Sequence, residues 1–207
     1  MILCDKHIRD LCTPPYYCDL PSGSITLSEP MIDNFVEGEK RVGKISYGLT
    51  TAGYDLRIAP EYKLYATNMY GVVDPKLFGN PDYEKEYLIH IRMATNEVVI
   101  MPAHSYLLTK SFEYLRIPKQ LKAKCVGKST IARCGILINT TPLEPGWNGY
   151  LTIEIANLLS TPVKLYPMEG IAQIEFETLT SSPETCYADK KGIYQNQVDI
   201  TPARIRK

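Results

Sequence analysis

The sequence lacks an excess of charge of either sign and lacks any long apolar run. Lysine plus arginine and aspartate plus glutamate both number 23. This balance excludes the global positive field that holds nucleic acids, so we expect no nucleic-acid partner and only a local anion site. No apolar run approaches the roughly 20 residues that cross a bilayer, and the opening MILCDKHIRD is charged where a signal peptide is apolar. We therefore expect a cytoplasmic protein with no membrane partner.

The sequence also lacks the motifs of metal-dependent and serine-dependent hydrolysis. The three histidines His7, His90 and His104 are scattered, and neither H-x-E nor P-C-x-x-C occurs. Zinc-dependent deamination of a nucleobase is therefore not expected. No G-x-S-x-G motif is present for a nucleophilic serine. The six cysteines are sparse and follow no secretion signal, which predicts free and mostly buried thiols.

Short strands dominate what the sequence does contain. A chain of 207 residues is of the size of one domain, and we expect residues 1–207 to form one. Brief apolar or alternating runs separated by Gly, Pro, Asn and Asp predict a mostly β barrel or sandwich. The expected strands are Ser24–Leu27, Lys44–Leu49, Tyr54–Ile58, Tyr62–Ala66, Tyr87–Ile91, Glu97–Met101, Ser105–Thr109, Gly135–Asn139, Tyr150–Ile155, Pro162–Tyr166 and Ile171–Phe176.

Helical signals are confined to the N-terminus. Asp5 is predicted to cap a short helix that ends before Pro14, with Ile8, Leu11 and Cys12 on one face. The polar segment 80–86 is expected to be a loop. Residues 181–207 form a polar tail, which we expect to be either loose or ordered over a site by a ligand or a neighbouring subunit.

A basic segment offers one candidate anion site. The motif GKST at 127–130 favours a P-loop only if a glycine stands five residues earlier, and Lys122 stands there instead. The segment from Lys110 to Arg133 contains seven basic residues and one acid, Glu113, which gives it a net charge of seven minus one, or plus six. Such a segment suits a triphosphate. The alternative is a solvated strand edge protected from aggregation by lysines.

Glu154 is the candidate for proton transfer. In YLTIEI the apolar residues alternate, which places Thr152 and Glu154 together on the other face of a strand. If that face lines a cleft, a desolvated carboxylate becomes a proton shuttle; if it faces solvent, Glu154 is an ordinary surface glutamate. Strand periodicity does not decide between the two.

Several ordered motifs resemble the dCTP deaminase family, relatives of the trimeric dUTPases. They are MILCDKHIRDL at the start, ISYGLTTAGYDLRI at 45–58, VDPKLF at 73–78, GKSTIARCG at 127–135, TPLEPGW with GYLTIEI at 141–155, GIAQIEF at 170–176 and YQNQ at 194–197. The resemblance implies a distorted, dUTPase-like β-barrel (β-clip) and a homotrimer with active sites between subunits. It also implies dCTP with Mg²⁺ as substrate, dUTP as product and dTTP as a candidate inhibitor.

The resemblance also assigns roles by position. Glu154 matches the general acid and base, supported by Arg133 and Ser129, and a backbone carbonyl near Thr140 helps to hold the attacking water. The resemblance implies that magnesium is bound to the triphosphate without dedicated protein ligands, and it implies no zinc. The matched substrate-binding residues are Lys128, Ser129, Thr130, Ile131, Ala132, Arg133, Glu144, Thr152, Ile153, Glu154, Gln173, Tyr187 and Gln197.

Three departures separate this chain from many relatives. Ile193 stands where a lysine is common, which leaves Lys190 and Lys191 as the candidates for that charge and the tail's phosphate contacts open. Lys128 replaces an arginine, which exchanges a bidentate fork for a point charge. Thr141-Pro142 replaces a His-Arg pair.

Three functions stay open on the sequence. The first is hydrolytic deamination of dCTP. The second is dUTPase activity, alone or combined with deamination, which Glu144 in the turn before the Gly149 strand keeps open. The third is a nucleotide-sensing trimer without turnover.

Overall fold

A curved antiparallel sheet forms the body of the protein. The computed structural model describes residues 1–40, 42–66, 71–139 and 141–206. The helices are α1 (Asp5–Cys12), α2 (Pro81–Tyr87) and α3 (Ser129–Ala132). The strands are β1 (Tyr17–Cys18), β2 (Ile25–Thr26), β3 (Gly48–Thr50), β4 (Gly53–Tyr65), β5 (Leu88–Arg92), β6 (Val99–Met101), β7 (Tyr106–Arg116), β8 (Leu121–Gly127), β9 (Ile136–Asn139), β10 (Asn148–Asn157), β11 (Val163–Leu165) and β12 (Gly170–Thr178).

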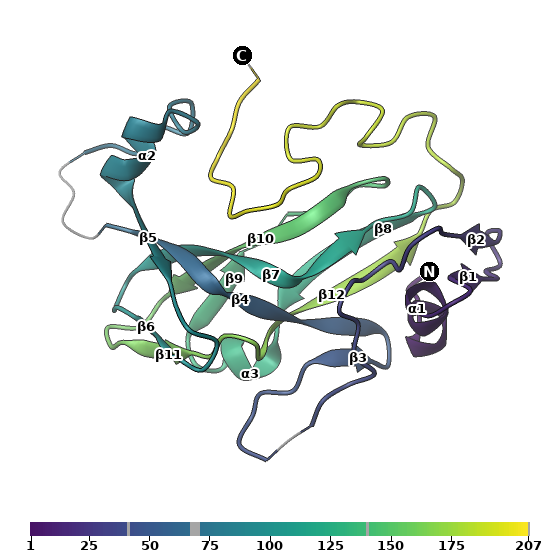
Figure 1. The fold of residues 1–207 in the computed structure, drawn as a ribbon, viewed down its shortest axis with the longest axis horizontal. Helices are drawn as coiled ribbons and strands as arrows, with labels where there is room; N and C mark the ends of the chain where they lie inside the picture. Colours follow the sequence, from purple (N-terminus) through teal and green to yellow (C-terminus); the bar gives the residue numbers. More distant parts are fainter. Residues whose placement is uncertain (41, 67–70, 140, 207) are drawn as a thin grey trace.

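The sheet curves until its two ends meet. Its strand order is β8-β12-β4-β7-β10-β9, with β3 and β5 also paired to β4 (Figure 1). The end strands β8 and β9 lie in contact. The space at Gly127 shows this, since a Cβ placed on that residue would be 3.5 Å from the Ile138 side chain. Ala123 of β8 also bridges to Leu143 just after β9. The predicted mostly β, barrel-like fold is therefore confirmed.

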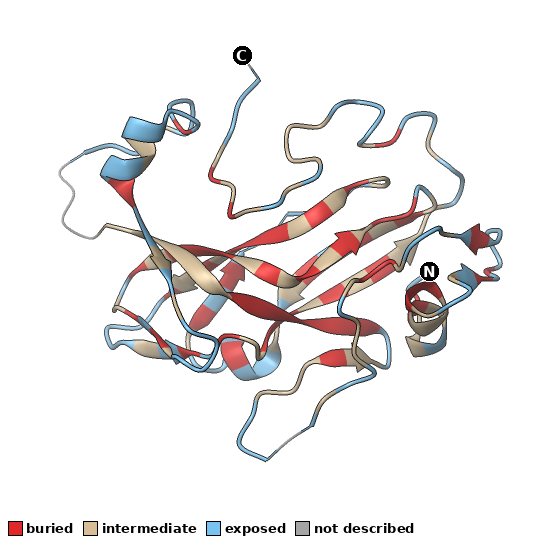
Figure 2. Ribbon diagram, viewed as in Figure 1, coloured by how far each residue is buried: buried red, intermediate tan, exposed pale blue. Residues whose placement is uncertain are grey.

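The core lies inside this curve and extends beneath α1. Ile153 and Ile155 on β10 are fully buried, while Glu154 between them is only partly so, as the alternation predicted. Ile8, Leu11 and Cys12 of α1 join the same cluster, whose buried positions recur along β4, β7 and β12 (Figure 2). The core-facing side of the predicted N-terminal helix is thus confirmed.

Three local predictions were wrong. Asp5 is the first residue of α1 and not its cap; Cys4 holds the cap position without a side-chain hydrogen bond. Segment 80–86 contains a helix, because the Asn80 side chain accepts the Asp82 N–H at 2.9 Å and Pro81 suits the first helical turn. Strand β8 was not among the predicted strands, although Leu121, Ala123 and Cys125 alternate as buried positions within it.

A buried ion pair ties the centre of the sheet together. Arg57 of β4 donates from Nε to Oε1 of Glu113 on β7 at 2.7 Å, and Glu113 is fully buried. The Arg57 backbone N–H also reaches Glu113 Oε2 at 3.1 Å. The guanidinium lies 4.8 Å from the Tyr47 ring centroid and 4.7 Å from that of Phe112. Burial raises the pKa of Glu113, while the attraction of Arg57 opposes that rise.

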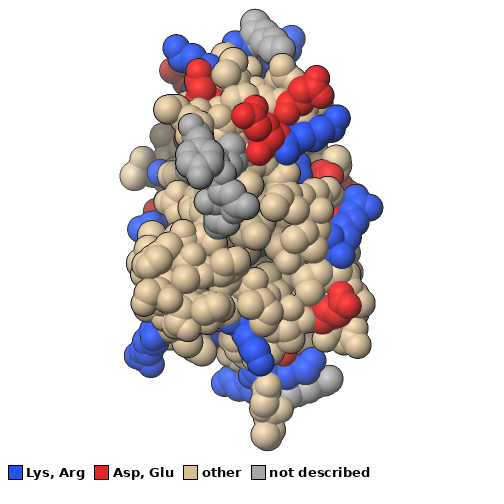
Figure 3. Space-filling view, turned by 90° about the vertical axis from the view of Figure 1, so that its left-hand side faces the viewer, with Lys and Arg blue, Asp and Glu red and all other residues tan. Residues whose placement is uncertain are grey.

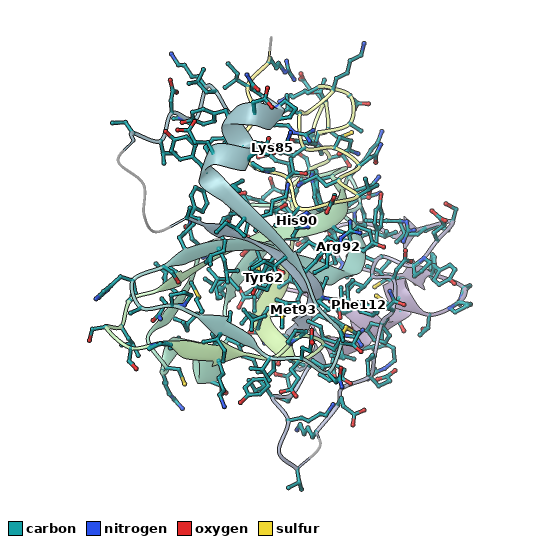
Figure 4. The ribbon with its side chains drawn as sticks, turned by 60° about the vertical axis from the view of Figure 1, so that its left-hand side comes forward. Tyr62, Lys85, His90, Arg92, Met93 and Phe112 are labelled. Carbon is teal, nitrogen blue, oxygen red and sulfur yellow. The ribbon has the colours of Figure 1, made fainter. Side chains whose placement is uncertain are left out.

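The C-terminal tail lies along β10 and is held by lysines. Lys63 donates to the Ile200 carbonyl at 3.0 Å, and Lys110 donates to the Val198 carbonyl at 3.1 Å. Lys110 also pairs with Glu61 at 2.5 Å. Arg92 on β5, labelled in Figure 4, approaches the same Glu61 carboxylate at 3.3 Å. Figure 1 shows the tail passing over the upper side of β10.

The cysteines form no disulfide within the described part of the chain. Four of the six, Cys12, Cys18, Cys125 and Cys186, are buried, and Cys134 is exposed. The prediction of mostly buried thiols is confirmed.

Among residues 1–40, 42–66, 71–139 and 141–206, no helix has both the length and the apolar character that spanning a bilayer requires.

Candidate functional site

A pocket of about 340 Å³ opens beside β10 and contains Glu154. Its lining comes from four regions of the chain: β10, the turn after β9, the tyrosines of β4 and β7, and the tail. The lining residues are Tyr65, Tyr106, Leu108, Asn139, Thr141, Pro142, Leu143, Glu144, Trp147, Leu151, Thr152, Glu154, Tyr187, Tyr194, Gln197, Thr201, Pro202 and Ala203. The polar face of β10 therefore lines a cleft, which settles the question that periodicity left open.

Glu154 is partly buried, and one of its carboxyl oxygens lacks a hydrogen-bond partner. Its Oε2 is inaccessible and has no hydrogen-bond partner among the described residues. Burial raises the pKa of Glu154 to about 7, and the opposing effect of its own backbone N–H is smaller. An unpartnered buried oxygen costs free energy, and such costs recur where a group must be free to exchange a proton. This carboxyl is therefore poised to accept or donate a proton near neutral pH.

Two tyrosines shield the carboxyl. The rings of Tyr65 on β4 and Tyr106 on β7 meet edge to face with centroids 5.5 Å apart. Asn139 pairs with Glu154 across β9 and β10 and lines the pocket with Tyr106. Burial raises the pKa of Tyr65 to about 12, so its hydroxyl stays protonated and available as a donor. Sequence reasoning missed both tyrosines, because their approach to Glu154 depends on the pairing of β4, β7 and β10.

The tail completes the opposite wall. Gln197 donates from Nε2 to Thr152 Oγ1 at 2.9 Å, and the Thr201 N–H reaches the same oxygen at 3.2 Å. The Trp147 indole N–H donates to the Tyr194 carbonyl at 2.8 Å. Tyr187 anchors the start of this wall through its N–H, which reaches the Pro145 carbonyl at 2.8 Å. Thr152, Tyr187 and Gln197 thus lie in one pocket with Glu154, as does Glu144, which is exposed.

The remaining predicted residues lie elsewhere in the chain. Ser129, Thr130, Ala132 and Arg133 are exposed on or beside α3, and none of them lines the Glu154 pocket. Ile136, which follows α3, pairs with Asn157, three residues beyond Glu154 and so about 10 Å along the strand.

Two of the predicted binding residues are buried on the core side. Ile131 and Ile153 belong to the core cluster, with side chains that are respectively 5% and 0% exposed. Their side chains cannot reach a ligand, so only their backbones are available to one. The other predicted position, Thr140, lies outside the described residues.

Lys128 and Gln173 form a second polar cluster with Asp55 of β4. The Lys128 ammonium makes an ion pair with Asp55 Oδ2. Gln173 donates from Nε2 to Asp55 Oδ1 at 3.3 Å and to Thr50 Oγ1 at 3.2 Å. Asp55 and Thr50 also line a second cavity of about 370 Å³, on the side of the barrel near α1.

The basic segment does not form one continuous patch. Arg116 pairs with Asp33 at 2.7 Å and Lys110 pairs with Glu61. On β8, Lys122 and Lys124 lie opposite Glu177 and Glu175 of β12. This part of β8 matches the alternative of a strand edge kept soluble by lysines. At the α3 end of the segment, the exposed cation Arg133 lies near the exposed hydroxyls of Ser129 and Thr130.

Sequence comparison places this geometry in a family. A family model described as dCTP deaminase-like matches residues 26–179. A dCTP deaminase of Erythrobacter litoralis is 43% identical over 204 residues, covering 99% of both chains. A dCTP deaminase of Gemmatimonas aurantiaca is 46% identical over 175 residues, covering 84% of this chain and 91% of that one. The chain belongs to the dCTP deaminase-like family.

A solved structure shares the fold. The 2'-deoxycytidine 5'-triphosphate deaminase of Agrobacterium tumefaciens superposes with a TM-score of 0.58 at 17% identity, over 86% of this chain. This chain spans 48% of the length of that protein. At such low identity the likeness supports the barrel and nothing more detailed.

Proposed function

We propose that the protein hydrolyses dCTP to dUTP and ammonia in the pyrimidine deoxynucleotide metabolism of the cytoplasm. The observation that carries the proposal is the buried Glu154 oxygen without a partner, in a pocket shaped by the strand that matches the family's nucleotide-contacting segment. Membership of the dCTP deaminase-like family supplies the substrate class.

Glu154 performs both proton transfers in this proposal. As a carboxylate it takes a proton from water while the water oxygen bonds to C4 of cytosine, and the ring nitrogen N3 receives that proton. The second proton of the water then passes through the carboxyl to the amino group, the C4–N bond breaks, and ammonia leaves. Positioned proton transfer of this kind contributes roughly 10²–10⁴-fold, so binding and charge stabilisation supply the remainder.

The triphosphate is assigned to Ser129, Thr130 and Arg133 at α3. Exposed hydroxyls, a guanidinium and backbone N–H groups are the donors that phosphate oxygens accept. Magnesium would be bound to the substrate triphosphate and would neutralise part of its charge. Within the described part of the chain no cluster of three or more Asp, Glu, His or Cys side chains is placed to hold a metal ion.

We further propose a homotrimer in which each site joins two subunits. Ser129 and Arg133 do not line the Glu154 pocket of their own chain, yet the reaction needs base, sugar and phosphates held together. A neighbouring copy that places α3 at the pocket mouth resolves this separation. Exposed apolar residues, including Ile100, Leu137 and Leu158, are available for subunit contacts. Figure 3 shows a broad area without charged side chains across the middle of one face.

Mixing two inactive variants tests the shared site. Glu154→Gln and Arg133→Ala are each expected to be inactive, because each removes one half of every site. After joint unfolding and refolding of equal amounts, about one quarter of the subunit interfaces in random cyclic trimers would pair an intact Glu154 with an intact Arg133. We expect a similar fraction of wild-type ammonia release. Refolded single variants serve as controls, and a mixture no more active than these would contradict the shared site.

The pH profile tests the role of Glu154 as base. The ionised carboxylate accepts the proton from water, and burial raises its pKa to about 7. We therefore expect kcat/KM to rise with pH up to about 7 and to fall about tenfold per unit below it. Initial rates of ammonia release between about pH 5 and pH 9 measure this profile. A profile that is flat down to pH 5 would show that the carboxyl does not act in its ionised form.

Product analysis separates the candidate functions. After incubation with dCTP and Mg²⁺, ammonia and dUTP without pyrophosphate support deamination alone. Release of both ammonia and pyrophosphate supports a bifunctional deaminase and dUTPase, which the position of Glu144 in the pocket lining favours as second candidate. Pyrophosphate from dUTP alone supports a dUTPase. Binding of dCTP without any product supports a nucleotide sensor and overturns the proposed activity.

A further inference from the structure

A second, small core lies beneath α2 and borders the Glu154 pocket. It forms a cluster separate from the main core and joins three buried residues to three partly buried ones: Phe78, Tyr87, Leu88, Tyr65, Tyr83 and Ala203. Two of the partly buried residues, Tyr65 of β4 and Ala203 of the tail, also line the pocket. The small core therefore contacts both the strand wall and the tail wall of the site.

Aromatic rings connect α2 to the wall of the pocket. Phe78 meets Tyr65 edge to face with ring centroids 6.3 Å apart, and it meets Tyr83 edge to face at 5.2 Å. Tyr83 and Tyr87 lie about one turn apart on α2, with centroids 4.5 Å apart. Tyr65 in turn contacts Tyr106 at 5.5 Å. A continuous series of ring contacts thus runs from α2 to both tyrosines of the pocket.

The polar ends of the α2 tyrosines are held by the chain that precedes the helix. The Tyr83 hydroxyl accepts the Asp74 N–H at 2.6 Å, and the Tyr87 hydroxyl donates to the Val72 carbonyl at 3.3 Å. With their hydroxyls bound there, the two rings turn their apolar parts to the small core. Figure 4, in which Lys85 marks α2, shows the helix beside the tail. The contacts of α2 with the site are therefore made by its aromatic rings.

Tyrosines make up most of the other titratable side chains of the pocket. These side chains are Tyr65, Tyr106, Glu144, Tyr187 and Tyr194. Burial raises the pKa of Tyr65 to about 12 and raises that of Tyr106 as well. Both hydroxyls are therefore protonated at neutral pH, so Tyr65 acts on Glu154 by excluding water and not by charge.

We infer that Phe78 is a positioning residue for the reaction, which holds Tyr65 in the pocket wall and so keeps water away from Glu154. The inference rests on the proposed function and deepens it, because it adds α2 to the parts of the chain that shape the site. Phe78 contacts Tyr65 on β4 and Tyr83 on α2, so removing its ring would separate the wall from its support. Water admitted behind Tyr65 would then solvate the carboxylate form of Glu154, which burial disfavours.

Removing the Phe78 ring from the full-length protein tests the inference. We expect Phe78→Ala to lower kcat/KM for dCTP about tenfold at about pH 8, because the wall of the site is no longer held in place. The acid limb of the kcat/KM profile should move down by about one pH unit, since a more solvated Glu154 ionises at lower pH. Phe78→Leu keeps most of the apolar bulk, so its kcat/KM should stay within about threefold of wild type.

Leu20→Ala is the matched control for a general loss of packing. Leu20 is 7% exposed, close to the 4% of Phe78, but it lies between β1 and β2, on the opposite side of the molecule from α2 (Figure 1). This variant should lose stability without moving the acid limb. The inference is overturned if Phe78→Ala and Leu20→Ala show the same midpoint. Should Phe78→Ala not fold, Tyr83→Leu takes its place, because the Tyr83 ring is only partly buried, and an unmoved midpoint there would count equally against the inference.

Unfolding measurements test the same wall without turnover. Because burial raises the pKa of Glu154, the stability gained from Glu154→Gln at about pH 8 reports how strongly the pocket is desolvated. Expressed as a ratio of unfolding equilibrium constants, this gain should be about tenfold smaller in the Phe78→Ala background than in wild type. An unchanged gain would refute the role of Phe78. If wild-type protein releases no ammonia, the proposed deamination fails, while this comparison still decides whether Phe78 controls the pocket.

Discussion

Replacing Glu154 by glutamine is expected to lower kcat for ammonia release by roughly 10²–10⁴-fold, with dCTP affinity changed little. Glutamine has nearly the same shape but neither accepts a proton from water nor returns it to ammonia. Single-turnover release of ammonia measures the loss, and calorimetric titration with dCTP and Mg²⁺ measures affinity. Turnover within a few fold of wild type would remove Glu154 from the mechanism.

The Glu154→Gln substitution should also change how the free energy of unfolding depends on pH. Because burial raises the pKa of Glu154 above its unfolded value, ionising it opposes folding, and this cost is present at high pH and disappears as pH falls below the unfolded value. Glu154→Gln should therefore gain stability relative to wild type at about pH 8 and show a smaller gain at about pH 5. Glu86→Gln is the matched control, since Glu86 is an exposed acid of α2 that does not line the pocket. It should leave both ammonia release and the pH dependence of stability unchanged.

Replacing Glu113 by alanine is expected to lower the free energy of unfolding by about 3–5 kcal/mol. The substitution leaves the Arg57 guanidinium charged within the sheet and removes the acceptor of its Nε–H and its backbone N–H. Urea denaturation at fixed protein concentration measures the change, because assembly makes stability depend on concentration.

Two variants separate the buried charge from other causes. Replacing both partners, as Arg57→Met with Glu113→Leu, should recover most of the loss, because no charge is left unpaired. Glu37→Gln breaks the Arg9–Glu37 pair, whose side chains are 38% and 59% exposed. It should lower the free energy of unfolding far less than Glu113→Ala does, because solvent screens an exposed pair. Equal losses for Glu113→Ala and Glu37→Gln would contradict the dependence on burial.

The strands were predictable where a single strand carries its own signal. Alternation along β10 identified which side chains face the core, and the turn residues separated most of the strands. Strand β8 was not predicted because its lysines made the segment read as a basic region. Its buried residues Leu121, Ala123 and Cys125 nevertheless alternate as in a strand. Helix α2 escaped because its surface is polar on nearly all sides and only Tyr87 is buried, so its one local signal was the cap at Asn80.

The site was predictable only in part, since a pocket depends on pairing between distant strands. Alternation singled out Glu154 but could not place its face in a cleft, and nothing local links Tyr65 or Tyr106 to it. Likewise, the charges of Lys128 and Asp55 are separated by 73 residues of sequence and meet only because β12 pairs both with β8, which ends just before Lys128, and with β4. The residues of α3 were identified by resemblance, while their distance from Glu154 within one chain required the structure.

The tail that walls the pocket also sets the acidity of the group inside it. Gln197 and Thr201 hydrogen-bond to Thr152 where the tail turns back along β10. Breaking these bonds would open the Glu154 carboxyl to water while the sheet and its core stay intact. Because burial raises the pKa of Glu154, lifting the tail would lower that pKa, so the position of the tail and the strength of the acid are linked.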